Sequence, residues 1–274
     1  MKISFDLNFL RSIEKATAEF GCLSAKSVQQ ELPHLGIATQ RIAGGGAVFA
    51  GVASPITQAI GVGLDGPVSP DELARLEEFF LQRGADVVLE LTPYIDDSVL
   101  RWIQARPYRL VEFSQIHTLS LSDGGISGDE PTRGVEIRIA RPEEYKLYTR
   151  TVAQGYSESV PLSDEDLLIF EGFSRAPGAL SFLATIDGAP AGGATLSVEG
   201  ELAGLHGGST LPAFRGRGVQ GVLISARLRE ARRRGCRVVY TVTHPSGSSQ
   251  RNMARVGFQP AYTRVKMSRP YKAE

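Results

Sequence analysis

The chain has 274 residues, of which 42% are hydrophobic and 22% charged, a globular composition that excludes disorder as the main state. This length suits two domains better than one. Thirty basic and thirty acidic side chains cancel, so no net charge draws the chain to nucleic acid or to an anionic membrane.

Cysteine and histidine are too sparse for a metal centre. Cys22 and Cys236 cannot supply a disulfide framework or a four-ligand zinc site, and the four histidines are scattered without metal-ligand spacing. Charged residues interrupt the N-terminal apolar runs, unlike a secretory signal, and no segment approaches the roughly 20 apolar residues of a membrane span. We therefore expect a soluble, cytoplasmic protein with no metal and no membrane partner.

The first half of the chain alternates the patterns of helices and strands. Leu7, Leu10, Ile13 and Phe20 recur at helical spacing. A later helix begins with a capping serine, a proline at the first helical position and a glutamate three residues after the serine, in Ser69-Pro70-Asp71-Glu72. In chain order, the patterns predict a helix at 6–20, strands at 47–52 and 58–64, a helix at 70–84 and a strand at 87–91.

A glycine-rich stretch, residues 122–134, predicts a surface linker between the halves. Beyond it, Asp187-Gly188 and Glu199-Gly200 are typical of hairpin turns. In chain order, the second half predicts a strand at 135–140, a helix from about 142, a helix at 163–175, strands at 180–186, 192–199 and 201–210, a helix ending at 234, a strand at 236–243, a helix at 248–256 and a strand near 261–267.

The two halves share an internal repeat. Residues 80–88 match 231–239 in type and order, and Thr92-Pro93 corresponds to Thr243-His244-Pro245. A further match relates 105–108 to 254–258. The spacing of about 150 residues makes each half one domain and favours duplication over chance similarity of two amphipathic helix–strand units.

The sequence between a predicted strand and the long helix, Arg215-Gly216-Arg217-Gly218-Val219-Gln220-Gly221, predicts an anion site. Glycines let backbone amides converge on one space, and the helix N-terminus and two arginines add positive charge. The alternative is a tight glycine turn with solvated arginines.

Two nucleotide-containing ligands compete for this loop. Its G-x-G-x-x-G spelling matches the dinucleotide fingerprint, which expects a carboxylate some twenty residues on, at the end of the next strand. The strand at 237–243 carries no acid, and too little chain follows it for a dinucleotide fold. The context therefore excludes the dinucleotide interpretation.

The second interpretation takes the whole C-terminal half together. Arg215-Gly216-Arg217-Gly218-Val219-Gln220 is similar to the (Arg/Gln)-x-x-Gly-x-(Gly/Ala) loop of the GNAT superfamily of acyl-CoA N-acyltransferases, which the sequence resembles over roughly 135–267. Ser209-Thr210-Leu211-Pro212, which ends the preceding strand, and Arg255-Val256-Gly257-Phe258, which closes the short helix, extend the resemblance. The order of the predicted elements also matches.

The resemblance implies a mixed sheet that is splayed at its middle, with acyl-CoA lying in the opening. The pantetheine would bond backbone groups of Ser209, Thr210 and Leu211, and the pyrophosphate would bind the amides of 215–220. Asn252, on the short helix beside this channel, is a further candidate cofactor ligand.

Two positions depart from the family's pattern. The last Gly/Ala of the loop is Gln220. The tyrosine that family members often carry four residues before Gly-Phe, as general acid for the leaving thiolate, is replaced by Met253. Tyr262 is a possible substitute, since a phenol with a pKa near 10 can protonate a thiolate, although strands are enriched in tyrosine in any case.

The general base would accept the proton of the acceptor ammonium. His206 precedes the loop, and an unperturbed imidazole titrates near neutrality, although a packed or surface histidine is at least as common. The arginines of the long helix, 227, 229 and 232–234, lack interleaved aromatic residues, so we expect a solvated helix end and no nucleic acid partner.

In the first half of the sequence, residues 63–72 occupy the place that corresponds to the glycine-rich loop 215–221 of the second half. Pro67 and Pro70 remove backbone donors, Ser69 would cap the helix, and acidic residues replace the arginines. We therefore expect no CoA site there, and a role as scaffold or acceptor wall.

Together these observations predict an α/β protein of two tandem GNAT-like domains with splayed mixed sheets flanked by helices: a degenerate domain at 1–124 and an acyl-CoA-binding domain at 133–274. The predicted function is transfer of an acetyl (acyl) group from acetyl-CoA to an amine, on a small molecule or a protein, by direct attack in a ternary complex. The alternative is a non-catalytic acyl-CoA-binding module, which Met253 favours.

Overall fold

The computed structural model describes residues 6–52, 54–121, 134–156, 162–245 and 247–272. The chain divides into two compact units. We call His117–Pro260 the C-terminal unit, and Ser4–Ile116 together with Ala261–Glu274 the N-terminal unit. The predicted linker at 122–134 lies outside the described residues, except Gly134.

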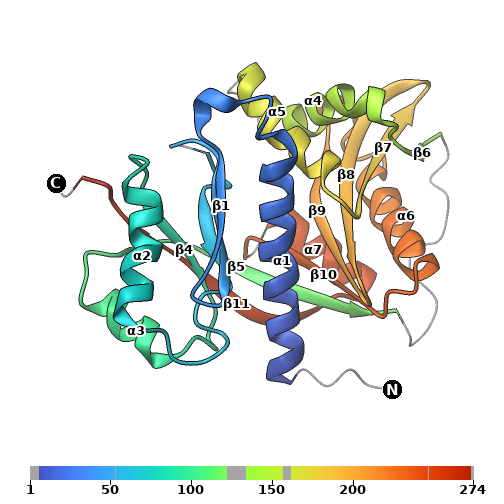
Figure 1. Cartoon of the computed structure of the whole chain (residues 1–274). Helices are drawn as coiled ribbons and strands as arrows, with labels where there is room; N and C mark the ends of the chain where they lie inside the picture. Colours follow the sequence, from blue (N-terminus) through green and yellow to red (C-terminus); the bar gives the residue numbers. More distant parts are fainter. Residues whose placement is uncertain (1–5, 53, 122–133, 157–161, 246, 273–274) are drawn as a thin grey trace. The chain divides into compact units, whose positions relative to one another are not determined.

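The N-terminal unit is a mixed sheet flanked by helices (Figure 1). Every residue of its second strand is buried, because Ala18 and Cys22 of the first helix lie against Gly46 while the next helix covers the sheet from its other side. The elements are α1 (Leu7–Val28), β1 (Ala38–Ile42), β2 (Gly45–Phe49), β3 (Gln58–Ile60), α2 (Pro70–Leu81), β4 (Val87–Leu91), α3 (Asp97–Gln104), β5 (Arg109–Ser120) and the C-terminal strand β11 (Gln259–Arg269).

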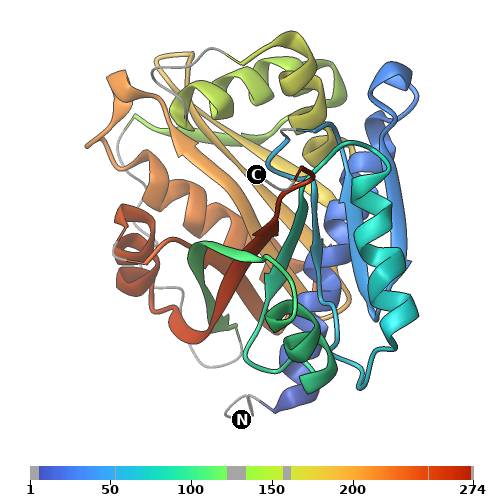
Figure 2. The same ribbon diagram turned by 90° about the vertical axis from the view of Figure 1, so that its left-hand side faces the viewer.

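The C-terminal unit has the same construction. Gly193 lies against Tyr148 and Val152, whereas Gly192 lies against Val219, so two different helices cover the two faces of the sheet; Figure 2 shows them on either side of the yellow and orange strands. The elements are β6 (Glu136–Ile139), α4 (Tyr145–Tyr156), α5 (Asp164–Arg175), β7 (Ala179–Ile186), β8 (Ala189–Glu199), β9 (Leu202–Thr210), α6 (Val219–Arg233), β10 (Val238–Thr243) and α7 (Ser248–Val256).

The two units repeat one topology. β1, β2 and β3 pair antiparallel and β3 then pairs parallel with β4; β7, β8 and β9 pair antiparallel and β9 then pairs parallel with β10. In both halves of the sequence a helix precedes the parallel strand, and a short helix and a long strand follow it along the chain. The predicted mixed α/β class is confirmed, and the shared topology supports the duplication.

The compact units differ from the predicted domains at the end of the chain. Residues Val265–Arg269 of β11 pair antiparallel with Leu91–Val87 of β4, which groups this strand with the N-terminal unit. Sequence patterns also missed β1 and β5, because these strands are partly exposed and interrupted by charged residues. The first helix extends eight residues beyond the predicted end, to Val28.

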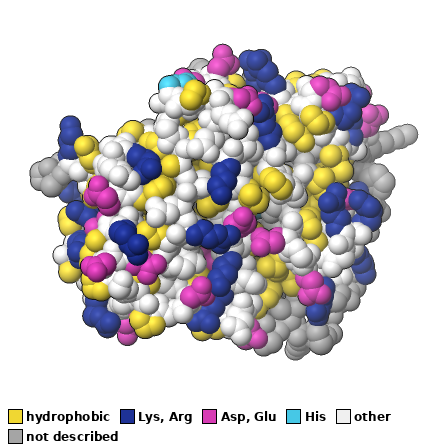
Figure 3. All heavy atoms as spheres, in the orientation of Figure 1, with side chains coloured by type: hydrophobic (Ala, Val, Ile, Leu, Met, Phe, Trp, Pro, Cys, Tyr) yellow, Lys and Arg dark blue, Asp and Glu magenta, His cyan; other side chains and the backbone are white. Residues whose placement is uncertain are grey.

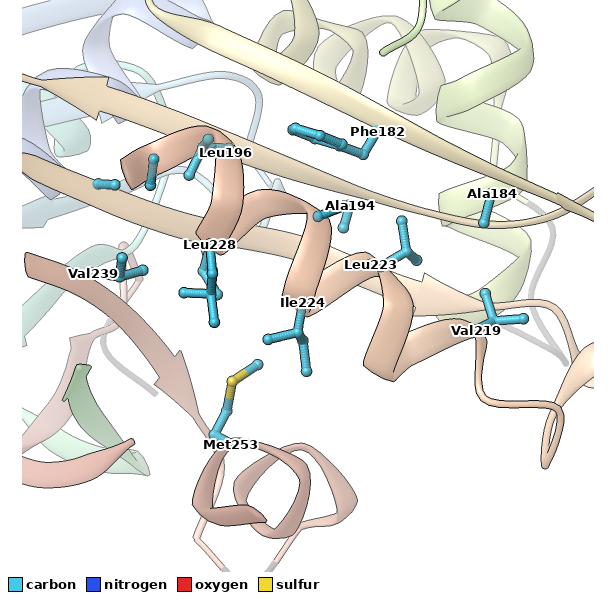
Figure 4. Packing of buried hydrophobic residues seen from close by; sticks show 14 of the residues in the cluster. Phe182, Ala184, Ala194, Leu196, Val219, Leu223, Ile224, Leu228, Val239 and Met253 are labelled. Atoms are coloured by element: carbon cyan, nitrogen blue, oxygen red, sulfur yellow. The ribbon is translucent and has the colours of Figure 1, made fainter. Parts of the chain in front are cut away.

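The core of the C-terminal unit forms where α6 packs on its sheet (Figure 4). Leu223, Ile224 and Leu228 of α6 are fully buried, and Phe182 and Leu196 of the sheet lie against them. Burying each such side chain stabilises the fold by roughly 1.5–3 kcal/mol. This packing fixes the start of α6 relative to the end of β9.

The surface carries charges of both signs in mixture, as Figure 3 shows for one face of the described residues. None of the helices in the described part of the chain has the length and apolar character needed to cross a membrane. The same residues contain no group of three or more His, Cys, Asp or Glu side chains suited to hold a metal ion.

Candidate functional site

The parallel pair β9–β10 opens partway along its length. The last paired residues are Leu205 and Thr241, where Oγ1 of Thr241 donates a 3.1 Å hydrogen bond to the carbonyl of Leu205. β9 nevertheless continues to Thr210 and β10 to Thr243. The strands therefore part here, and residues 206–210 of β9 have no partner on this edge in the register with β10.

The other edge of β9 contains a β-bulge. In the register with β8, Gly193 pairs with Ser209 but Thr195 pairs with His206. Two glycines of β9 therefore stand opposite one residue of β8, and the first, Gly207, has a left-handed φ of 53°. A bulge leaves ladder groups unpaired and turns the backbone locally, as often happens beside active sites.

α6 begins without a side-chain cap, immediately after the loop that follows β9. Its N-cap residue is Gly218, at φ 77°, and its first turn contains no acid. By contrast, an Asp or Ser side chain accepts an amide hydrogen bond at the start of α1, α2, α3 and α5. The first-turn amides of α6 therefore have no side-chain acceptor of their own, and the helix dipole makes this end electropositive.

These features surround a pocket of about 910 Å³. It is bounded by the end of α4, the end of β9, the loop with the start of α6, and α7. The described lining residues are Gly155, Tyr156, Gly208, Ser209, Thr210, Phe214, Arg215, Gly216, Gly218, Val219, Gln220, Gly221, Val222, Ile224, Ser248, Ser249, Asn252, Arg255 and Val256.

The electrostatics of the pocket suit an anion. Arg215 and Arg255 are its charged side chains, and none of the described lining residues is Asp or Glu. A second helix, α7, also begins at a glycine without a side-chain cap, and its first residues, Ser248 and Ser249, line the pocket. Two helix N-termini without side-chain caps and two arginine side chains thus border the same pocket. Free backbone amides and guanidinium groups are the donors that bind phosphate groups in proteins.

The end of β9 is held open toward the pocket by α4. Oγ of Ser209 donates a 2.8 Å hydrogen bond to the carbonyl of Val152, and a Cβ on Gly155 would lie 2.5 Å from that Oγ. Only glycine permits this close approach. The next residue, Thr210, has a buried Oγ1 without a hydrogen-bond partner among the residues that the structure describes, which leaves it available to a ligand.

Most of the predicted cofactor residues line this one pocket: Ser209, Thr210, Arg215, Gly216, Gly218, Val219, Gln220 and Asn252. Leu211 and Arg217 do not. The amide of Leu211 donates to the carbonyl of Ala191, and the guanidinium of Arg217 lies 5.7 Å from the centre of the Phe214 ring.

The two predicted catalytic residues also lie outside the lining. His206 bonds Oγ of Ser197 through Nε2 at 2.8 Å. Because it pairs with Thr195, whose Oγ1 bonds the Tyr148 hydroxyl, His206 lies on the α4 face of the sheet. Tyr262 belongs to the N-terminal unit, where its buried hydroxyl donates to Glu14, and burial raises its pKa.

Met253 is part of the hydrophobic core. Its side chain is 3% exposed and points toward Ile224 of α6 (Figure 4), and Met253 is not among the residues that line the pocket. Its neighbour Asn252 lines the pocket, and Oδ1 of Asn252 accepts a 2.9 Å hydrogen bond from Arg255. The position that the family uses for an acid is thus occupied by a packing residue.

The equivalent turn of the N-terminal unit is internally satisfied. Oγ of Ser69 accepts the amide of Glu72, whose carboxylate accepts the amide of Ala43 at 2.8 Å. Asp65 pairs with Lys15 at 2.9 Å. Unlike the start of α6, this helix start is already capped and negatively charged.

Sequence reasoning did not place Gly155 and Tyr156 at the predicted cofactor loop, because nothing local to α4 signals contact with a strand more than fifty residues later. It was wrong about Arg227, which was expected in a solvated helix end but is 1% exposed. Its spacing from Gln220 and Leu223 places it on the inward face of α6, and this periodicity carried the signal. Arg229 and Arg232–Arg234 are exposed, as expected.

Comparison with known proteins agrees with this geometry. Residues 144–258 match the model of the acetyltransferase (GNAT) family. Over nearly its whole length the chain is similar in structure to a GCN5-related N-acetyltransferase from Kribbella flavida, with a TM-score of 0.65, 16% identity, and coverage of 92% of this chain and 95% of that one. A tandem GNAT protein from the clavulanic acid biosynthesis pathway gives a TM-score of 0.62 and 16% identity, covering 98% and 95%. No curated protein matches the sequence.

The segment 144–258 is thus a GNAT acetyltransferase domain, and the chain has the fold of tandem GNAT proteins. The predicted resemblance and fold class are confirmed. Family and fold support acyl transfer from CoA in general, with acetyl-CoA as the donor that this family uses.

Proposed function

We propose that the C-terminal unit is an N-acyltransferase that moves an acetyl group from acetyl-CoA to an amine acceptor. The observation that carries the proposal is the pocket at the splay of β9 and β10, into which two uncapped helix N-termini, Arg215 and Arg255 converge. An adenosine nucleotide with a pyrophosphate and a long neutral arm matches that charge distribution. The proposed site residues are those that line the pocket, with Leu211 and Arg217 as outer contacts.

The cofactor would lie along the pocket from loop to strand. The pyrophosphate would accept hydrogen bonds from the amides of Gly216, Gly218 and the first turn of α6, and Arg215 would add a charge-assisted contact. The pantetheine would run beside the unpaired edge of β9, with Thr210 and Asn252 as polar contacts. This places the thioester near the bulge, where the chain path exposes backbone donors.

The reaction would proceed by direct attack. The lone pair of the amine forms the new bond to the thioester carbon while the C=O π pair moves onto oxygen; collapse breaks the C–S bond and leaves a thiolate. His206, on the α4 face, is the proposed base, through water, for the ammonium proton. Tyr156, which lines the pocket and is 65% exposed, is a better placed acid for the thiolate than Tyr262, whose hydroxyl is directed at Glu14.

Turnover tests the proposal. Incubation of the protein with acetyl-CoA and a panel of amines, read by free thiol release, is expected to identify at least one accepted amine. His206→Gln should lower kcat while leaving CoA affinity unchanged, and Tyr156→Phe should do so more than Tyr262→Phe. Failure of the wild-type protein to bind CoA by calorimetry would refute the proposal.

A second function is favoured by one observation. Met253 fills the usual acid position with a buried core side chain, which suits a module that binds acyl-CoA without turning it over. That module is expected to bind CoA and acetyl-CoA but to release no thiol with any amine of the panel.

We also propose that the N-terminal unit binds no CoA and serves as scaffold or acceptor wall. The hydrogen bonds of Ser69 and Glu72 consume donors that a pyrophosphate would need, and the acids repel it.

A further inference from the structure

Arg227 is a buried cation without a carboxylate partner among the described residues. It projects from the middle of α6 and is 1% exposed. Its Nε donates to the carbonyl of Leu223, and its Nη1 donates to the carbonyls of Thr195 at 3.2 Å and His206 at 3.4 Å. Its Nη2 is buried and has no hydrogen-bond partner in the part of the chain that the structure describes.

The carbonyls that Arg227 binds belong to the last pair of residues before the β-bulge. Thr195 of β8 and His206 of β9 face one another, and the two glycines of the bulge follow directly. The guanidinium fork therefore supplies hydrogen bonds where the bulge interrupts the ladder between the two strands. Held in this way, β8 and β9 keep the bulge open instead of sliding into regular register.

Nη2 points toward the wall of the pocket. A Cβ on Gly208 would lie 3.5 Å from Nη2 and 3.2 Å from Nε2 of Gln220. Both Gly208 and Gln220 line the pocket. Gly208 has no side chain that would separate the guanidinium from the pocket, so the charge of Arg227 acts on the space inside the pocket.

Stability alone does not explain an arginine here. Burying a cation without an anion costs free energy, and an apolar side chain of similar length would cost less. Burial lowers the pKa of Arg227 to about 10, against opposing contributions from Tyr148 and Tyr156, so the group stays protonated at neutral pH. The charge is thus retained next to the pocket at a cost to folding.

We propose that Arg227 is a positioning residue for acyl transfer: it holds the β8–β9 bulge open, and its buried charge polarises the thioester carbonyl that lies at the bulge. This inference rests on the proposed binding of acyl-CoA. During attack the carbonyl oxygen gains the π pair, and a fixed cation behind a glycine wall favours that negative charge without needing to reorganise.

The test uses acetyl-CoA labelled with ¹³C at the carbonyl, bound to the intact protein and observed by NMR. In the wild-type protein the carbonyl resonance is expected downfield of free acetyl-CoA. Arg227→Met should lose that displacement, Arg227→Lys should keep part of it, and Arg232→Met, a control on the exposed face of the same helix, should retain it. Arg227→Met removes an unpaired charge but also the hydrogen bonds to the carbonyls of Thr195 and His206, so its thermal unfolding should stay near that of the wild type.

The two proposals fail separately. CoA that does not bind to the wild-type protein would refute the CoA site. If CoA binds but the displacement persists in Arg227→Met, or that variant loses it only together with a large loss of stability, the role of Arg227 is structural and the inference is wrong. Should Arg227→Met not fold, the neutral variant Arg227→Gln decides, since a displacement that persists there would also overturn the inference.

Discussion

Replacing Gly218 by valine perturbs the loop before α6 at the residue from which the helix begins. Gly218 has φ 77° and provides the N-cap of a helix with no side-chain cap. A β-branched residue disfavours this left-handed conformation by about 1–2 kcal/mol. The variant is therefore expected either to hold the conformation at that cost or to turn the loop and redirect its amides.

The magnitude follows from the number of amides involved. Turning the loop removes the amides of Gly218 and Val219 from a bound phosphate, and hydrogen bonds to charged groups contribute about 1.5–3 kcal/mol each. Two such bonds correspond to about 3–6 kcal/mol, or a loss of CoA affinity of about 10²–10⁴-fold. The stability cost should lower the unfolding temperature by only about 2–4 °C for each kcal/mol.

Calorimetric titration with CoA measures this loss, and Gly200→Val is the matched control. Gly200 also has a positive φ, 57°, and an added Cβ there meets nothing within 4 Å, but it lies in the β8–β9 hairpin, outside the pocket lining. The control should lose stability and keep its CoA affinity. A folded Gly218→Val protein that binds CoA as the wild type does would refute the assignment of this loop to the phosphates.

Three further predictions concern single side chains. Arg215→Ala should weaken CoA binding less than Gly218→Val, and the loss measured by titration should shrink as salt rises because the interaction of an exposed arginine is screened. Met253→Ala should destabilise the protein by about 2–5 kcal/mol in chemical unfolding, whereas Met253→Leu should cost under about 1.5 kcal/mol; equal effects would contradict the core assignment. Arg233 and then Arg234 lower the pKa of Glu230 to about 2, so its stabilising contribution is present above its unfolded pKa of about 4.3 and is lost as the pH falls toward 2; the difference in unfolding temperature between the wild type and Glu230→Gln should therefore vanish over that range.

The loop and the C-terminal elements were predictable because their signals are local. Glycine spacing, the cap at Ser163 and the helical periodicity of α6 each act within a few residues, and the structure has α7 at the predicted bounds. The association of β11 with β4 was not predictable in this way, because strand pairing depends on contacts between distant segments.

The site shows the same division. The glycine pattern of residues 215–220 predicted a phosphate-binding loop. The part of the pocket formed by Gly155 and Tyr156 could not be predicted in this way, because it depends on how α4 packs on β9. The helical spacing of Arg227 from Gln220 and Leu223 indicated a place on the inward face of α6, whereas the arginine-rich composition of the helix end suggested a solvated side chain. Its burial follows from the tertiary packing of α6 against the bulge.

The central claim is that one of the two units of this chain binds acyl-CoA and the other does not. Calorimetric titration of the intact protein with acetyl-CoA tests it most directly through the stoichiometry. The account predicts one site per chain, which Gly218→Val abolishes. Two sites per chain, or one site that survives Gly218→Val, would contradict it.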